Sequence, residues 1–194
     1  MCSVITKQTG FDYSAYIKPA LITESQDDTY SFIQNKDFEG TKINLKTDFY
    51  IPISVAENFP RITLDTPSLL VSISGKIGNV GLYLLKRKAF IGGAVGICKL
   101  YDAEEGKTTL YELMSPVGQQ HFSSLVKASS HANITVEDIR KMTVFLPQNH
   151  KEMEQINRYC ENLDNLITLH QRKHYFHLIY SINRKKSHHH DKKT

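Results

Sequence analysis

A regular apolar repeat near the C-terminus constrains the fold of this chain more than any other feature. From Met153 onward, hydrophobic residues recur at alternating steps of three and four, the spacing of one face of a paired α-helix. Residues 150–186 contain no proline or glycine that would interrupt such a helix. About 37 helical residues would extend roughly 55 Å, whereas a compact chain of this length has a radius of gyration of about 16 Å. We therefore expect a helix that projects beyond the body.

The apolar stripe of this helix needs a partner that covers it. The sequence offers no second long helix, so we expect the partner to be another polypeptide. The predicted seam consists of Met153, Ile156, Cys160, Leu163, Ile167 and His170.

The rest of the chain has the composition of an ordinary globular domain. Hydrophobic residues make up 40% and charged residues 23% of the 194 residues, which excludes a disordered or collagen-like chain. No apolar run approaches the ~20 residues that a membrane helix needs, and the N-terminus lacks the apolar core of a secretory signal. We expect a cytoplasmic protein that does not enter a membrane.

Charge is distributed unevenly along the chain. Residues 1–149 hold 15 basic and 15 acidic residues, whereas residues 150–194 hold 9 basic and 5 acidic ones and supply the entire net charge of +4. A body with no net charge cannot attract nucleic acid uniformly. If it binds DNA, it must do so through a local patch.

The body alternates short apolar runs with turn residues, which predicts an α/β (α+β) fold with a mixed sheet. Strands are expected at residues 30–34, 68–74, 79–85 and 90–101, and the second and third form a hairpin around a turn at residues 75–78. Residues 102–107 are expected to form a charged loop. Helices are expected at 110–114, at 116–126 after the N-cap Ser115, and briefly after Thr135, which opens a capping box. A strand at 142–146 precedes the long helix. The predicted parts are a body at 1–148, the helix at 150–186 and a disordered basic tail at 187–194.

The residues that usually carry catalysis or bind metals do not form a recognisable pattern. Gly75, Gly78 and Gly81 lie between two strands and lack the spacing of a dinucleotide or Walker A loop. His170, His174 and His177 share a helix face, but no carboxylate or cysteine completes a metal site there. The three cysteines are widely spaced and indicate neither a disulfide framework nor a metal knuckle. We expect no enzyme activity, no metal and no cofactor.

Nucleic-acid chemistry is the remaining possibility. Basic residues follow the hairpin at 86–88, and Lys76 lies in its turn. Polar loop residues lie near these basic residues in the sequence, and Asn, Ser and His side chains can read base edges while Lys and Arg hold phosphates. These polar residues are Asn35, Asn79, Ser129, Ser130, His131 and Asn133.

Four segments together resemble the specificity subunit of type I restriction–modification systems. SLLVSISGKIGNVGLY (68–83) resembles the family's glycine hairpin, and SSHANITVEDIRKMTVFLP (129–147) resembles the end of its target recognition domain. EQINRYCENLDNLITLHQRK (154–173) resembles the start of its long conserved helix, which is the most specific match. GFDYSAYIKPAL (10–21) resembles the opening of some recognition domains. The family's usual strand segment ahead of Gly10 is not recognisable, so we expect the first core strand to be missing or rearranged.

This resemblance implies that the chain reads DNA for a modification and restriction complex. In the family, each recognition domain reads one part of a bipartite target in double-stranded DNA. Long helices space two such domains and hold the methyltransferase subunits, while other subunits carry out methyl transfer and ATP-driven cleavage. This chain matches one domain and one helix, so it resembles half a subunit. Two copies that pair as a homodimer would restore the two-fold arrangement and read an inverted repeat.

We expect eight residues to face DNA, with the methyltransferase and restriction subunits as protein partners. One alternative class is a coiled-coil interaction module, such as an antirestriction decoy or assembly partner, that binds protein without sequence preference on DNA. The other is an enzyme with an unrecognised site, which a transition-metal dependence or a perturbed titratable pair in a deep pocket would favour. The eight predicted DNA-facing residues are Lys18, Lys36, Ser74, Lys76, Asn79, Lys127, Ser130 and His131.

Overall fold

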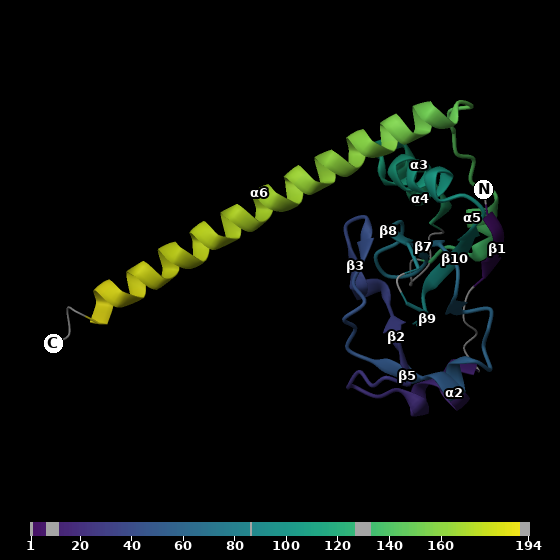
Figure 1. The fold of residues 1–194 in the computed structure, drawn as a ribbon, viewed down its shortest axis with the longest axis horizontal. Coiled ribbons are helices and arrows are strands. Elements are labelled where there is room, and N and C mark those ends of the chain that lie inside the picture. Colours follow the sequence, from purple (N-terminus) through teal and green to yellow (C-terminus); the bar gives the residue numbers. More distant parts are fainter. Residues whose placement is uncertain (1, 7–11, 86, 127–132, 191–194) are drawn as a thin grey trace. The chain divides into compact units, whose positions relative to one another are not determined.

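The computed structural model describes residues 2–6, 12–85, 87–126 and 133–190. The chain forms two compact units, residues 1–153 and 154–194, and each is described by itself. The body is a mixed α+β unit with two sheets, as the sequence predicts. Figure 1 shows the four-stranded sheet and the short helix α2 (Ile53–Ala56) at the lower end of this body, and helices α3 (Ala103–Met114) and α4 (Pro116–Leu125) at its upper end.

The six-stranded sheet carries the predicted hairpin. β7 pairs antiparallel with both β8 and β10, while β4 joins β8 in parallel, so the sheet is mixed. All five residues of β7 are buried, which is expected for a central strand covered on both faces. In spatial order its strands are β1 (Cys2–Thr6), β10 (Val95–Leu100), β7 (Ser68–Ser72), β8 (Val80–Tyr83), β4 (Lys42–Ile43) and β3 (Phe38–Glu39).

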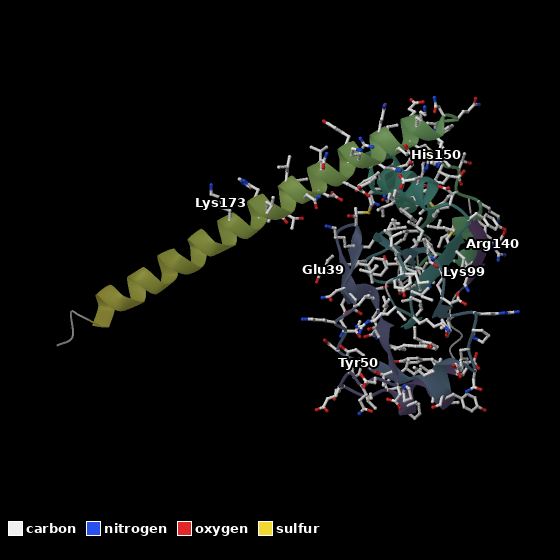
Figure 2. The ribbon with its side chains drawn as sticks, viewed as in Figure 1. Glu39, Tyr50, Lys99, Arg140, His150 and Lys173 are labelled. Atoms are coloured by element: carbon white, nitrogen blue, oxygen red, sulfur yellow. The ribbon has the colours of Figure 1, made fainter. Side chains whose placement is uncertain are left out.

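The four-stranded sheet forms the other half of the body. Its strand β2 pairs antiparallel with β5 and parallel with β9. Phe32 and Phe90 are fully buried on these neighbouring strands, with ring centroids 6.0 Å apart. Figure 2 labels Tyr50 of β5 in the lower part of the body. In spatial order the strands are β5 (Tyr50–Pro52), β2 (Thr29–Ile33), β9 (Ala89–Ile91) and β6 (Thr63–Leu64).

Short helical turns connect these strands, and longer helices follow them. α3 and α4 pack with β7, β8 and β10 around a second apolar cluster that includes Val80, Leu110 and Phe122. The remaining helical elements are η1 (Tyr13–Ile17), η2 (Lys18–Ala20), η3 (Asn35–Asp37), α5 (Val136–Arg140) and α6 (His150–His190). No helix in the described ranges is long and apolar enough to span a membrane.

A strand is present ahead of Gly10, so this segment is not missing, although the sequence did not indicate it. β1 begins at Cys2 and pairs antiparallel with β10, with Thr6 opposite Ile97. A register shift between Cys2 and Ile5 interrupts the ladder. The sequence did not indicate this strand because the segment resembles no familiar strand motif, and its pairing depends on a partner more than ninety positions away in the sequence.

The predicted loop at 102–107 is also wrong, because its charges begin a helix. The Asp102 carboxylate accepts a hydrogen bond from the Glu105 backbone N–H at 2.8 Å and caps α3. This bond is the main reason why the pKa of Asp102 lies below its ordinary value. Glu104 and Glu105 occupy the first turn, where negative charge is favoured by the helix dipole. The capping pattern outweighs the polarity that suggested a loop.

The predicted strand at 142–146 is wrong for a different reason. Its alternation is real, since Met142 and Val144 pack on the second apolar cluster while Phe145 is exposed. The segment nevertheless pairs with no strand in the described part of the chain. The Phe145 backbone N–H donates instead to the Glu112 carboxylate, at 2.8 and 2.7 Å from its two oxygens. A side chain has taken the place of a strand neighbour.

The remaining predicted strands and helices of the body are present, but one strand is divided and the helix expected at 110–114 begins earlier, at Ala103. Ser115 caps α4, and its hydroxyl accepts a hydrogen bond from the Gly118 backbone N–H. Thr135 and Asp138 form the predicted capping box of α5. The long apolar run at 90–101 divides into β9 and β10, because Ala94 adopts a positive φ of 68° between them.

The long helix is confirmed, and its ends are close to the expected ones. α6 runs from His150 to His190, past the expected end at residue 186. The first compact unit of the chain ends at Met153. The rest of the predicted tail, residues 191–194, lies outside the described residues.

Gly118 in α4 provides a test of the packing between α3 and α4. A methyl group there would lie 2.5 Å from the Leu113 Cα and also press on the Glu112 carbonyl oxygen, and neither backbone atom can rotate away. Alanine favours a helix over glycine by only about 1 kcal/mol, so the overlap should prevail. We expect Gly118→Ala to lower the free energy of unfolding by about 1–3 kcal/mol in urea denaturation. Gln120→Ala, an exposed change in the same helix, should stay within about 0.5 kcal/mol of the unsubstituted protein.

Candidate nucleic-acid interface

The turn between β7 and β8 is the centre of the candidate site. Gly75 and Gly78 have φ values of +72° and +83°, a backbone region that side chains rarely tolerate. A methyl group at Gly78 would also lie 3.0 Å from the Phe122 ring. Both positions therefore favour glycine where the strand folds back so sharply, and at Gly78 the Phe122 ring also crowds a side chain. The glycine spacing noticed in the sequence therefore reflects a turn rather than a nucleotide loop.

A buried hydroxyl closes this turn from inside. Ser72 is fully buried, and its Oγ donates a hydrogen bond to the Lys76 carbonyl oxygen. The Ser72 Oγ also accepts a hydrogen bond from the Asn79 backbone N–H at 3.1 Å. Because Ser72 satisfies backbone groups on both sides of the turn, residues 74–78 are held in one compact arrangement.

Three other segments meet the turn. The Asn35 side-chain amide donates to the Ser74 carbonyl oxygen at 2.6 Å, and the Gln119 amide donates to the Gly78 carbonyl oxygen at 3.0 Å. Ser74 also forms an isolated antiparallel bridge with Asn133. Residues that are far apart in the sequence thus converge on this hairpin, which brings polar side chains around an exposed lysine, Lys76.

The structure brings together three of the eight predicted DNA-facing residues. Ser74, Lys76 and Asn79 all lie in or beside the turn; Lys76 is exposed and Asn79 is half-buried. Lys36 lies next to Asn35 in η3 and so near the turn. However, its Nζ pairs with the Asp48 carboxylate and lies 5.5 Å from the centre of the Phe49 ring. A phosphate would have to compete with Asp48 for this lysine.

Lys18 lies in another part of the body. It begins η2, four residues before Ile22, which bridges to Tyr50 at the edge of the four-stranded sheet. The turn belongs to the other sheet, and no hydrogen bond among the described residues joins Lys18 to it. The predicted residues Lys127, Ser130 and His131 lie outside the described residues.

Sequence reasoning noticed Asn35 and Asn133 only as polar loop residues and missed Gln119. A side-chain amide in the middle of a helix has many ordinary roles, so nothing in its spacing pointed to a hairpin 41 positions earlier. Gln119 also donates to the Leu113 carbonyl oxygen at 2.9 Å, which ties the turn to the junction of α3 and α4. Only the packing of α4 against the sheet revealed these contacts.

A buried carboxyl group shapes the loop that carries Asn35 and Lys36. Asp37 is 6% exposed, and its carboxylate accepts a hydrogen bond from the Gln34 backbone N–H at 2.7 Å. Burial raises the pKa of Asp37 above its ordinary value, although the Gln34 hydrogen bond and the nearby Lys36 charge oppose the shift. The loop is therefore held by a carboxyl group whose ionisation is less favourable than that of an exposed aspartate.

The long helix presents a second candidate surface. All six predicted seam residues lie on α6. The exposed fractions of Leu163 and Ile167 are 41% and 54%, and those of Leu166 and Leu169 are 62% and 60%. Large apolar side chains are thus exposed over several turns of one helix.

The described residues contain no group of three His, Cys, Asp or Glu side chains that could hold a metal ion. Open hollows also occur among the described residues of the body. One of about 480 Å³ is lined by residues of β4 and β8 with Leu45 and Leu84, and one of about 300 Å³ lies beside Arg87 and Lys88. What the turn offers chemically is hydrogen bonding and positive charge, which suits recognition of a polar ligand.

A solved structure shares this architecture. A chain from work on complex assembly and conformational transition of the type I R-M system matches with a TM-score of 0.55 and 15% sequence identity, over 79% of this chain and 35% of that chain. The crystal structure of a type I restriction-modification system S subunit from M. genitalium matches with a TM-score of 0.49 and 20% identity, over 78% of this chain and 36% of that chain. No protein-family model matches the sequence, and neither does any curated protein.

The chain thus has a fold that occurs in type I restriction–modification systems, and the resemblance predicted from its motifs is confirmed at the level of the fold. It spans about a third of the length of the chains that it matches.

The raised pKa of Asp37 predicts a specific dependence of stability on pH. Between the unfolded value of 3.8 and the higher folded value, the folded protein holds a proton that the unfolded chain releases. The contribution of Asp37 to the free energy of unfolding is therefore complete below pH 3.8 and declines as the pH rises through the folded pKa. Asp37→Asn removes this titration.

We expect the stability of Asp37→Asn, relative to the unsubstituted protein, to increase as the pH rises through this range. Urea denaturation at a series of pH values measures the difference. Asp27→Asn, in an exposed loop, serves as the control for removing one negative charge. A constant difference for Asp37→Asn across the range would contradict the prediction.

Proposed function

We propose that this chain is a DNA-recognition subunit of a type I restriction–modification complex. One observation carries the proposal: the β7–β8 turn is closed by Ser72, held from outside by Asn35 and Gln119, and presents the exposed Lys76. In this proposal the turn reads base edges and phosphates in one half of a bipartite target in double-stranded DNA. The fold shared with a type I system chain supports this assignment.

The distribution of charge supports local rather than diffuse contact with DNA. Residues 1–149 carry no net charge, so non-specific attraction to phosphates is weak in this region. A recognition domain of this kind would bind tightly only where shape and hydrogen bonding match. Further phosphate contacts would come from partner subunits.

The proposal assigns catalysis to other subunits. The methyltransferase subunit would transfer the methyl group and the restriction subunit would cleave DNA, while this chain selects the sequence. It would act in the cytoplasm, without a cofactor or metal of its own.

The helix α6 would join two copies of the chain and hold the methyltransferase. Its exposed leucines and isoleucine follow the spacing of a paired helix, and their burial is favourable by roughly 25 cal/mol per Å². An antiparallel pair of such helices would place two recognition domains in a two-fold arrangement. The dimer would then read an inverted repeat.

A second candidate function depends on α6 and does not involve the β7–β8 turn. The neutral body and the exposed apolar helix also suit a protein-interaction module, such as a decoy or assembly partner, that captures a methyltransferase. Such a module would show no sequence preference on DNA. Selection of duplexes from a random pool separates the two functions.

We expect the purified chain, alone or with a methyltransferase subunit, to enrich a defined sequence from random duplex DNA. Lys76→Ala should weaken binding to that sequence and reduce the slope of log affinity against log salt by about 1 if Lys76 holds a phosphate. Loss of a base contact would instead relax one position at a cost of about 1–3 kcal/mol. Lys141→Ala is the matched control, because Lys141 is an exposed lysine at the C-terminal end of α5. Failure to enrich any sequence would refute the DNA-recognition proposal.

Light scattering tests the role of the helix. We expect the unsubstituted chain to be a dimer that captures the methyltransferase subunit. The double substitution Leu163→Glu and Ile167→Glu should yield a monomer, because it places charges on the apolar seam. Asn162→Glu adds a charge to an exposed polar position of the same helix and should leave the dimer intact. A monomeric unsubstituted chain would refute pairing through α6.

A further inference from the structure

Two side-chain amides hold the opposite ends of the β7–β8 turn. Asn35 donates to the Ser74 carbonyl oxygen at 2.6 Å, where the chain enters the turn, and Gln119 donates to the Gly78 carbonyl oxygen at 3.0 Å, where it leaves. Asn35 comes from η3 and Gln119 from α4, respectively 39 and 41 positions away from the carbonyls that they bind. We call this pair, Asn35 and Gln119, the amide clamp.

The turn does not need the amide clamp in order to close. Ser72 Oγ already satisfies the Lys76 carbonyl oxygen and the Asn79 backbone N–H. The Ile77 backbone N–H donates to the Gly75 carbonyl oxygen at 3.0 Å. Exposed hairpin turns are commonly hydrogen-bonded by their own backbone and by water alone. The clamp adds a restraint from outside to a turn that its own residues already form.

This restraint comes with an unfavourable feature at Asn35. The Asn35 Oδ1 is buried and accepts no hydrogen bond from the described residues. Burial of an unpaired acceptor destabilises a fold, so native proteins contain few such atoms, and each one calls for an explanation. Asn35 therefore leaves its own acceptor without a hydrogen bond while its amide nitrogen binds the entry of the turn at the Ser74 carbonyl oxygen. Stability alone does not account for this choice of residue.

Gln119 is fixed more firmly than a surface amide. Its Nε2 donates to both the Gly78 and the Leu113 carbonyl oxygens, at 3.0 and 2.9 Å. Its Oε1 lies 3.2 Å from the position that a Cβ of Gly78 would occupy. Gln119 thus links the exit of the turn to the junction of α3 and α4. This link restrains the position of Gly78 relative to the rest of the body.

We propose that Asn35 and Gln119 are positioning residues for DNA sequence discrimination: they contact the turn, not the DNA, and fix it in the conformation that presents Ser74, Lys76 and Asn79. This inference rests on the proposed function. A base contact requires its donor and acceptor atoms in fixed places, whereas a lysine that pairs with phosphate tolerates movement. Fixing the turn before binding lowers the ordering cost of the specific complex. The clamp should therefore affect specific binding far more than non-specific binding.

The test uses the full chain, the duplex selected from the random pool, and a scrambled duplex of equal length at the same salt concentration. Asn35→Ala and Gln119→Ala should each weaken binding to the selected duplex on the order of fivefold, about the value of one hydrogen bond, and leave binding to the scrambled duplex unchanged. A purely structural role would lower both affinities equally. Asn58→Ala, which removes a similar amide bond to the Ser54 carbonyl oxygen, and Gln120→Ala are matched controls that should change neither affinity.

Hydrogen exchange in the free full chain provides a second measurement that does not depend on DNA. The backbone amides at residues 75–79 should exchange on the order of fivefold faster in each clamp variant, while those of β2 and β9 keep their rates. Equal losses on both duplexes, unchanged affinity for the selected duplex, or unchanged exchange in the turn would each overturn the inference. Failure of the unsubstituted chain to prefer any duplex would overturn the proposed function itself, together with this inference.

Discussion

The Ser72 hydroxyl links the sheet to the candidate site. It lies at the end of a strand whose residues are all buried, and it bonds backbone groups on both sides of the following turn. Through this contact the rigidity of β7, paired on both edges, extends into residues 74–79. The glycines allow the sharp reversal, and the amides of Asn35 and Gln119 fix its two ends. A recognition surface on loops needs support of this kind, because mobile loops pay an ordering cost on binding.

The long helix presents the opposite physical situation. Met153 is buried, but several later apolar residues are exposed, with Leu166 and Leu169 more than half accessible. A single helix in water gains little from propensity alone, and most helical stability in proteins comes from packing an apolar face. The body buries its own apolar side chains in two clusters. The helix, in contrast, gives a physical reason for the chain to associate with another polypeptide.

Two segments show how local polarity misleads when backbone hydrogen bonds are not considered. Residues 102–107 look like a charged loop, yet Asp102 caps α3 and the glutamates that follow favour its first turn. Residues 142–146 look like a strand, yet the Phe145 N–H is satisfied by the Glu112 carboxylate. In both cases a carboxylate accepts the hydrogen bond of a backbone N–H. The sequence pattern assigned that role to water at residues 102–107 and to a neighbouring strand at residues 142–146. Alternating burial shows which side chains face the core. It does not show which groups accept the hydrogen bonds of the backbone.

The sequence by itself determined the features that depend on near neighbours. The 3–4 repeat predicted α6, and Ser115 and Thr135 predicted helix starts. The glycine spacing predicted the hairpin of β7 and β8, because the conformational demands of a tight turn are local. Only the tertiary structure decided the contacts that cross many residues. It paired β1 with β10, placed Lys36 against Asp48, and brought Asn35 and Gln119 to one turn while Lys18 lies by the other sheet. Such contacts depend on strand order and helix packing, which a local pattern does not encode.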